Sequence, residues 1–220
     1  VPERLLKVVD ADTLAAAMVK AAQKSSVPIA LHLDHGYSYE GMMKAIRWGF
    51  TSLMYDGSAL AFAENLKRTK EITRIAHSLG MSVEGELGFV GCYEGTNGSK
   101  VETMVSPEMA AEFTGKTKID ALAIAVGNNH GSSRGNGSFN INRLSELSSA
   151  VDVPLVMHGG SRLSKEEYKH SIQAGITKVN VSTDTSLVAS EILKAEMERN
   201  PNINYISLMG IVKKGVKDSV

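Results

Sequence analysis

Short apolar runs alternate with longer amphipathic stretches along the whole 220-residue chain. The apolar runs predict six strands, at 28–34, 51–55, 82–87, 120–126, 153–157 and 177–181. Nearly every position in these runs is apolar, which is typical of parallel strands covered on both faces. The amphipathic stretches predict one helix before the first strand and one after each strand. They lie at 11–23, 39–48, 61–79, from 106 onward, and at 142–150, 164–174 and 184–199, with a final short helix behind them.

A repeated unit of one strand and one helix predicts either a doubly wound sheet or a (β/α)8 barrel. The polar residues help to choose, because a notable one lies on or directly after every strand. In a barrel such positions gather at one rim, the carboxyl-terminal face that holds barrel active sites. A doubly wound sheet instead binds its ligand near one switch point. Six contributing strands therefore favour a TIM (β/α)8-type barrel, with about six β/α units visible, as a single domain over residues 1–220.

Three histidines stand at predicted strand ends, each followed by a glycine: His35, His130 and His158. Three imidazoles that meet at one rim predict a zinc site with an open fourth position. The glycines would let the backbone turn sharply. For any single one of these residues, a hydrogen-bonded strand-end histidine is an equally good interpretation. The other three are expected to be packing or surface residues, with His32 in the barrel interior and His77 and His170 on helices.

Asp34 directly precedes the first of these histidines. An ionised carboxylate at this place could move a proton while a metal stabilises the negative charge that results. The alternative is a carboxylate that only orients a metal ligand. The turns after the last two strands, 159–161 and 180–183, are rich in glycine and hydroxyl groups, and in barrels this is the usual phosphate-binding location.

Composition narrows the class of protein. Lys plus Arg and Asp plus Glu both number 24, so the formal net charge is zero and no surface for nucleic acid or an anionic membrane is expected. Apolar runs are too short for a membrane helix. A single cysteine, Cys92, fits a reducing compartment, and no signal peptide is expected, so the cytoplasm is the expected location.

Together, the motifs resemble those of the class II, zinc-dependent ketose-bisphosphate aldolases, the fructose- and tagatose-bisphosphate aldolase family. They are ALHLDHG, FTSLMYDGS, SVEGELG, VGNNHG, PLVMHGGS and KVNVST, within about 28–185. The resemblance implies catalytic roles in proton transfer for Asp34 and Glu94. It implies metal ligands, with the catalytic zinc on His35, His130 and His158 and an alternate, more buried position near Asp56 and Glu86. It implies that substrate is bound by Gly131, Gly159, Gly160, Ser161, Asn180, Val181, Ser182 and Thr183.

The implied reaction is reversible aldol cleavage of a ketose 1,6-bisphosphate to dihydroxyacetone phosphate and an aldehyde phosphate, through a zinc-stabilised enediolate. Asp34 would exchange the hydroxyl proton. The implied cofactor is Zn²⁺, with another divalent metal as the alternative and a monovalent cation left open. The implied assembly is a homodimer or homotetramer. Fructose-specific members usually have Asp at the position of Ser182. The serine therefore slightly favours tagatose or another ketose as the substrate.

Three alternatives stay open. The resemblance to the aldolase family implies that the chain lacks the family's first two strands and its last helix. The first alternative is therefore an inactive phosphate-binding barrel fragment. A metal-dependent phosphosugar epimerase or isomerase is another, and it would need two acid/base groups flanking one carbon. A Schiff-base aldolase would use Lys178, the only lysine in a predicted strand, and would leave the three histidines unexplained.

Overall fold

The computed structural model describes residues 1–88, 105–124, 141–161 and 163–219. The strands within these residues are β1 (His32–Gly36), β2 (Ser52–Tyr55), β3 (Ser82–Leu87), β4 (Ala121–Ile124), β5 (Leu155–Met157) and β6 (Ile176–Val179). The helices are the 3-10 helix η1 (Glu3–Lys7) and the α-helices α1 (Ala11–Gln23), α2 (Tyr39–Arg47), α3 (Phe62–Ser78), α4 (Pro107–Thr117), α5 (Ile141–Ala150), α6 (Lys165–Gln173), α7 (Thr183–Arg199) and α8 (Tyr205–Asp218).

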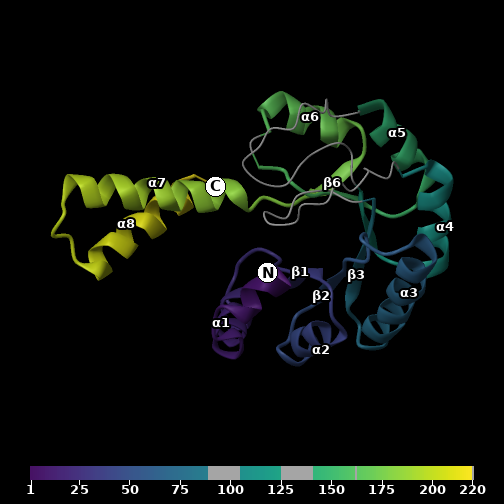
Figure 1. Cartoon of the computed structure of the whole chain (residues 1–220), viewed down its shortest axis with the longest axis horizontal. Helices are drawn as coiled ribbons and strands as arrows, with labels where there is room; N and C mark the ends of the chain where they lie inside the picture. Colours follow the sequence, from purple (N-terminus) through teal and green to yellow (C-terminus); the bar gives the residue numbers. More distant parts are fainter. Residues whose placement is uncertain (89–104, 125–140, 162, 220) are drawn as a thin grey trace.

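The strands form one parallel sheet in the order β1-β2-β3-β4-β5-β6, so each strand pairs with the next one in the sequence. The sheet curls into a half-barrel, and α2 to α6 lie on its outer side (Figure 1). Because all six strands run in the same direction, their carboxyl ends lie along one rim. The predicted α/β fold of the TIM-barrel type is confirmed.

Local sequence signals set several element boundaries. The α1 helix and β3 begin and end at the predicted residues. Ser106 caps α4, with Pro107 at its first position, and Ser164 forms the predicted capping box with Glu167 at the start of α6. The final helix, α8, has 14 residues and is longer than the short helix that the sequence predicts.

The first strand lies further along the chain than predicted. The apolar run predicts 28–34, whereas β1 is His32–Gly36, and its ladder with β2 begins at the pair of His32 and Ser52. Ile29, in the predicted strand, is 48% exposed. The apolar run therefore only borders the strand, where the Leu31 carbonyl oxygen accepts from the amides of Thr51 and Ser52. The strand β1 itself continues through the polar residues Asp34 and His35, where its pairing with β2 is irregular.

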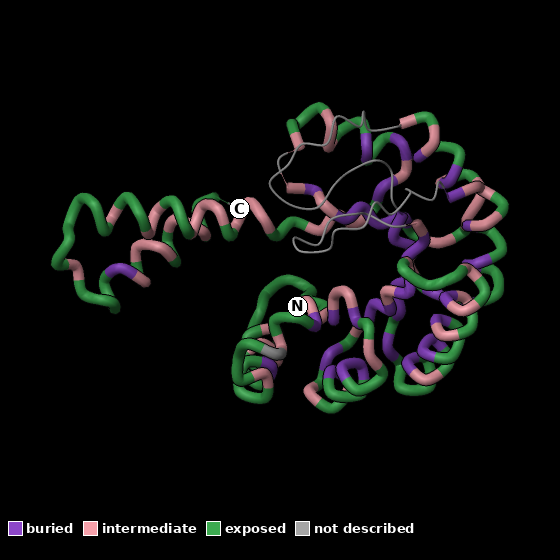
Figure 2. Tube along the Cα trace, in the orientation of Figure 1, coloured by how far each residue is buried: buried purple, intermediate pink, exposed green. Residues whose placement is uncertain are grey.

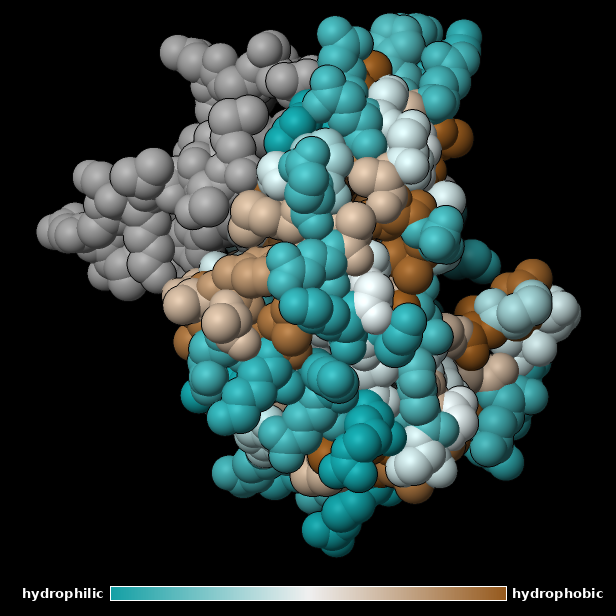
Figure 3. Space-filling model, turned by 90° about the vertical axis from the view of Figure 1, so that its right-hand side faces the viewer, coloured by the Kyte–Doolittle hydropathy of each residue, from teal (hydrophilic) through white to brown (hydrophobic). Residues whose placement is uncertain are grey.

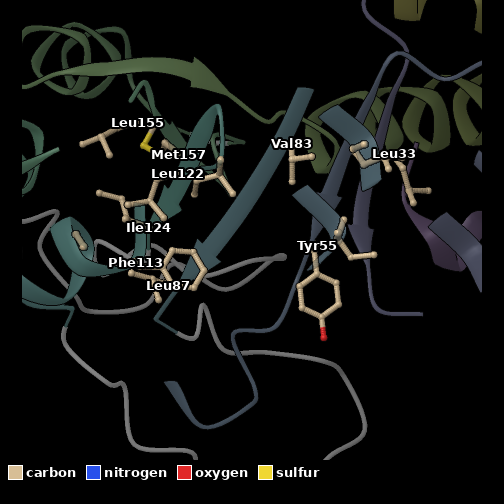
Figure 4. Packing of buried hydrophobic residues seen from close by; sticks show 14 of the residues in the cluster. Leu33, Tyr55, Val83, Leu87, Phe113, Leu122, Ile124, Leu155 and Met157 are labelled. Atoms are coloured by element: carbon tan, nitrogen blue, oxygen red, sulfur yellow. The ribbon is translucent and has the colours of Figure 1, made fainter. Parts of the chain in front are cut away.

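The two faces of the sheet differ in composition. Side chains that face the helices form the main core, labelled in Figure 4 as Leu33, Tyr55, Val83, Leu87, Phe113, Leu122, Ile124, Leu155 and Met157. A separate, smaller cluster of Met54, Ala123 and Val156 comes from positions that alternate with these. Because neighbouring strand residues point to opposite faces, this second cluster faces the inside of the half-barrel. Glu84 and Glu86 share that inner face on β3.

Helices α7 and α8 differ from the rest of the molecule. They lie against each other and extend away from the half-barrel (Figure 1). No residue of α7 is buried, and Leu208 is the buried residue of α8, so Figure 2 shows this pair as a mixture of exposed and intermediate residues. The outer face around α3 and α4 is mostly hydrophilic, with apolar side chains scattered over it (Figure 3). The buried residues thus concentrate in the sheet and the helices that cover it.

Candidate metal centre and active site

The backbone of β1 brings two neighbouring polar residues to the same side. In a regular strand Asp34 and His35 would point to opposite faces. The pairing of β1 with β2 shifts between Leu33 and Gly36, and His35 has a positive φ of 46°. This irregularity turns the His35 ring toward the inner rim, where it contacts Asp56 and His158. A non-glycine residue in this region is a strained conformation that is common at functional sites.

The glycines after two of the histidines serve different purposes. Gly159 has the predicted positive φ, 70°. At the other site the positive φ belongs to His35 itself and not to Gly36. Gly36 is needed for close approach instead, because a Cβ atom there would lie 2.6 Å from the carbonyl oxygen of Met54 on β2.

His35 stands between two carboxylates of the neighbouring strands. Its Nδ1 lies 2.7 Å from Oδ2 of Asp56, which follows β2, and 3.7 Å from Oε2 of Glu86 on β3. Burial would lower the pKa of His35, but the Asp56 hydrogen bond and the nearby negative charges outweigh it and raise that pKa. Burial would likewise raise the pKa of Asp56, and the hydrogen bonds from His35 and Ser58 outweigh it, so that pKa is lowered.

His158, which follows β5, is buried in the centre of the site. Its Nδ1 lies 3.0 Å from Nε2 of His35, and its Nε2 lies 2.8 Å from Oε1 of Glu84. The other oxygen of Glu84 is 2.7 Å from Nζ of Lys178 on β6. Burial would raise the pKa of Glu84, but the His158 hydrogen bond and the positive charge of Lys178 lower it to about 2. Glu84 is therefore an ionised carboxylate.

Asp34 is held from the opposite edge of the sheet. Its Oδ1 accepts a hydrogen bond of 3.0 Å from the side-chain amide of Asn180, which follows β6 and is 146 residues away in the sequence. The same amide nitrogen lies 3.2 Å from Nε2 of His158. The carboxylate predicted to move a proton is thus fixed next to two of the predicted metal ligands.

Two overlapping groups of side chains could hold a metal ion among the described residues: Asp34, His35 and His158, and His35, Asp56 and Glu86. The candidate ligand atoms within each group lie within 4.8 Å of one another. Imidazole nitrogen with carboxylate oxygen is a donor set that suits zinc and several other divalent metals. The first group combines two predicted ligands of the catalytic metal, His35 and His158, with the predicted base Asp34. The second combines the predicted ligands of the more buried position, Asp56 and Glu86, with His35.

Glu86 gives an independent reason to expect a cation. It is 2% exposed, and within the described part of the chain its Oε2 has no hydrogen-bond partner. Burial, followed by the negative charges of Asp56, Glu84 and Asp34, raises the pKa of Glu86 well above its usual value. His35, 3.7 Å from this oxygen, is already hydrogen-bonded to Asp56. A buried carboxylate oxygen without a hydrogen bond is costly, so the residues present fit a divalent metal at this place.

The two turns predicted to bind phosphate lie together. The Gly160 amide donates to the Asn180 carbonyl oxygen at 2.9 Å. The Ser161 hydroxyl accepts from the amides of Ser182 and Asp184, each at 3.3 Å. Val181 is 47% exposed, and α7 begins at the last predicted residue of this group, Thr183. The glycine and hydroxyl residues therefore surround the amino-terminal end of α7, where amide groups favour anions.

Three predicted site residues, Glu94, His130 and Gly131, lie outside the described residues. The histidines expected in structural positions take them. His32 is largely buried, with Nδ1 2.8 Å from the Ser52 hydroxyl, and burial lowers its pKa to about 4. His77 bonds to Asp120, and His170 is exposed.

Sequence reasoning placed Glu84 with Glu86 on the third strand among the polar groups at the rim, but it assigned Glu84 no role in the site. Its period-two spacing with Glu86 on an otherwise apolar strand was the available signal, because both carboxylates then face the barrel interior. Its partner Lys178 was considered only as a Schiff-base lysine.

Comparison with known proteins identifies the family. The family model described as "Fructose-bisphosphate aldolase class-II" matches residues 3–220. The chain belongs to this family. Among its relatives, the sulfofructosephosphate aldolase of Alkalicoccus urumqiensis is 37% identical, over 89% of this chain and 69% of that protein. The probable fructose-bisphosphate aldolase of Bacillus subtilis (strain 168) is 35% identical, over 93% of this chain and 73% of that protein.

Two solved structures described as aldolases, one of them putative, have a similar fold. The YdjI aldolase of Escherichia coli K12 has a TM-score of 0.84 at 33% sequence identity, covering 99% of this chain and 75% of that one. A putative fructose-1,6-bisphosphate aldolase from Coccidioides immitis has a TM-score of 0.85 at 29% identity, covering 94% of this chain and 74% of that one. The curled six-stranded sheet and the helices around it are therefore shared with these two structures.

Membership of the class II aldolases establishes the enzyme class as a lyase, as the sequence predicts. The family is generally zinc-dependent, and it implies a phosphorylated sugar as substrate. None of the helices in the described residues is long and apolar enough to cross a membrane.

Proposed function

We propose that the chain catalyses reversible aldol cleavage of a ketose 1,6-bisphosphate, fructose or tagatose, to dihydroxyacetone phosphate and an aldehyde phosphate. The observation that carries the proposal is the position of Asp34, whose carboxylate is fixed by Asn180 next to His35 and His158. Cleavage of a carbon–carbon bond between a ketone and a hydroxyl requires a base at the hydroxyl and an electrophile at the ketone. Asp34 would supply the base, and a metal held by the neighbouring histidines His35 and His158 would supply the electrophile.

In this mechanism His35 and His158, together with the predicted third ligand His130, would hold the zinc ion, which when bound would supply a Lewis acid for the negative charge that develops on the ketose oxygens. The carboxylate of Asp34 takes the proton of the substrate hydroxyl as the carbon–carbon bond breaks. The predicted acid/base residue Glu94 then protonates the carbon left behind to give dihydroxyacetone phosphate, and the reverse reaction uses the same groups in the opposite sense. The hydrogen bond from Asn180 keeps the Asp34 carboxylate in one orientation. The turns at 159–161 and 180–183 bind a phosphate through amide and hydroxyl groups.

The environment of Lys178 favours the metal mechanism over a Schiff base. A Schiff base forms from a neutral amine. The Lys178 side-chain nitrogen lies 2.7 Å from the Glu84 carboxylate in an ion pair, so it is already engaged and is not free to attack a carbonyl carbon. An epimerase needs two acid/base groups on opposite sides of one substrate carbon. The position of Asp34 supports one such group, and no second one is supported within the described residues.

The test is cleavage of fructose 1,6-bisphosphate and of tagatose 1,6-bisphosphate, with triose phosphate release as the measurement. Sulfofructose phosphate is a third substrate, because it appears in the name of one relative. Each assay is run as purified, after a chelator, and after zinc is restored. We expect cleavage that the chelator abolishes and zinc restores. Cleavage that survives the chelator, or no cleavage of any of the three, would contradict the proposal.

The substitution Asp34→Asn tests the proton-transfer role. It keeps the side chain's shape and one oxygen for the Asn180 amide, but it removes the base, so kcat should fall by about 10²–10⁴-fold. Zinc affinity, measured by competition with a chromogenic chelator, should change far less than kcat. A matched control is Asp120→Asn, on the opposite end of the sheet, which should keep wild-type kcat. An active Asp34→Asn variant would rule out this role.

A further inference from the structure

The Glu84 side chain is a buried carboxylate that the proposed reaction does not use. It comes from the middle of β3, is 2% exposed and reaches two partners from other strands. One carboxylate oxygen lies 2.8 Å from Nε2 of His158 and the other lies 2.7 Å from Nζ of Lys178. Burying a carboxylate is unfavourable unless its oxygens are paired. Here both oxygens are paired, and one partner is a predicted metal ligand.

These contacts determine which ring nitrogen of His158 carries the proton. An ionised carboxylate only accepts hydrogen bonds, and its ion pair with Lys178 keeps Glu84 ionised. The short contact with His158 therefore requires a proton on Nε2. In a neutral imidazole the other nitrogen is then an acceptor. That nitrogen, Nδ1, lies 3.0 Å from Nε2 of His35, among the candidate ligand atoms of the metal centre.

A competing contact does not reverse this assignment. The Asn180 amide nitrogen lies 3.2 Å from the same Nε2 of His158, where it would need an unprotonated ring nitrogen. That contact is longer than the 2.8 Å between the same ring nitrogen and the Glu84 carboxylate, and the amide is a neutral group. Hydrogen bonds to an ionised group are shorter and about twice as strong as those between neutral groups. The carboxylate of Glu84 therefore decides the tautomer.

We propose that Glu84 is a positioning residue, which accepts the Nε2 proton of His158 and so presents the unprotonated Nδ1 to the metal. Lys178 fixes Glu84 from the far side and compensates its charge. The inference deepens the proposed function and rests on its metal site. It assigns a role to a carboxylate that neither the proton transfer nor the metal ligands account for.

The direct test is the tautomer of His158 in the metal-free wild-type chain. Long-range ¹H–¹⁵N NMR of the labelled protein at pH 8 distinguishes the two tautomers, and the His158→Gln variant assigns the signals. We expect a proton on Nε2 and none on Nδ1. A protonated Nδ1 in the wild-type spectrum would overturn the proposal, and this measurement needs no variant of Glu84 to fold.

The second test is zinc affinity, measured with the metal alone in competition with a chromogenic chelator. Removing a carboxylate that orients a ligating histidine typically weakens metal binding by about 10–100-fold, so Glu84→Gln should show that loss. The control is Asp120→Asn, because Asp120 also pairs with a histidine, His77, but at the opposite end of the sheet. It should stay within about twofold of wild type. Wild-type affinity in Glu84→Gln would overturn the proposal.

The two proposals fail in different ways. A chain that binds zinc through an Nε2-protonated His158 but cleaves no ketose bisphosphate would overturn the proposed substrate and leave the role of Glu84 intact. A chain that cleaves its substrate while His158 carries its proton on Nδ1 would do the reverse.

Discussion

Glu84 and Glu86 stand two residues apart on the inner face of β3, each 2% exposed, in opposite electrostatic surroundings. Glu84 has a hydrogen bond from His158 and an ion pair with Lys178, and its pKa falls to about 2. The carboxylate of Glu86 faces the charges of Asp56, Glu84 and Asp34, and its pKa rises well above the usual value. The same side chain, equally buried on one strand, is thus stabilised as an anion at one place and penalised at the other.

The difference separates two uses of a buried carboxylate. The surroundings of Glu84 already contain the charge that compensates it, so it can orient a neighbour whether or not a metal is bound. Near Glu86 the corresponding group is the His35 ring, 3.7 Å from Oε2 and already hydrogen-bonded to Asp56, and Oε2 has no hydrogen-bond partner within the described residues. This is the condition expected of a side chain that is completed by a bound cation. The two carboxylates should therefore respond in opposite directions when charge is removed.

The largest change is expected from Lys178→Met, which takes the compensating charge away from Glu84. Breaking a fully buried pair costs about 3–5 kcal/mol. The Lys178 side chain is 38% exposed, so water screens part of the pair, and we expect a loss of about 1–3 kcal/mol in the free energy of unfolding. Urea unfolding measures it. The control Lys116→Met breaks an exposed pair with Glu112 and should cost less than about 0.5 kcal/mol. Equal effects in the two variants would contradict the contrast.

A smaller change of opposite sign is expected from Glu86→Gln. The neutral amide removes a buried charge that repels three neighbouring carboxylates, so the metal-free protein should become more stable by about 1 kcal/mol. Thermal unfolding in the presence of a chelator measures this gain. With zinc added the advantage should shrink or reverse, because the wild-type carboxylate then faces a cation. A destabilised metal-free variant would show that Glu86 is already compensated.

The smallest expected effect is a difference between metal-free wild type and Glu86→Gln in how the free energy of unfolding depends on pH. A carboxyl whose folded-state pKa is raised binds more protons in the folded chain than in the unfolded one, so stability falls as pH rises. For Glu86 that loss of stability begins near the usual pKa of a glutamate, 4.5, and continues through the raised pKa of the folded state. Urea unfolding of metal-free wild type and Glu86→Gln should agree at acid pH and diverge toward neutral pH. Parallel curves would contradict the assignment.

Much of the fold followed from local patterns in the sequence. Apolar runs and helix caps predicted the six strands, the order of the elements and the barrel-type sheet, because each signal lies within a few residues. The conformation of His35 did not follow from the sequence. The sharp backbone turn was expected at the glycine after it, Gly36, whereas the positive φ belongs to His35 itself. The pairing of Glu84 with Lys178 did not follow either, because the two residues are 94 positions apart.

The site itself was predicted in part. The sequence indicated that Asp34, His35 and His158 share a rim, and the structure places them within one candidate metal group. Their chemical roles remain predictions, as do those of Glu94, His130 and Gly131 outside the described residues. Periodicity shows which face a residue occupies, but not which distant charge it meets there.

The irregular turn in β1 has a mechanical consequence. Asp34 and His35 are neighbours on β1, so one short stretch of backbone carries both the proposed base and one proposed metal ligand. Distortions of the barrel that shift β1 relative to other strands move the backbone of both residues together. His158 and Asn180, on separate strands, lack that covalent tie. Barrel motion should therefore change the distance between Asp34 and His35 less than their distances to His158 and Asn180. Those longer-range distances depend on the surrounding hydrogen bonds.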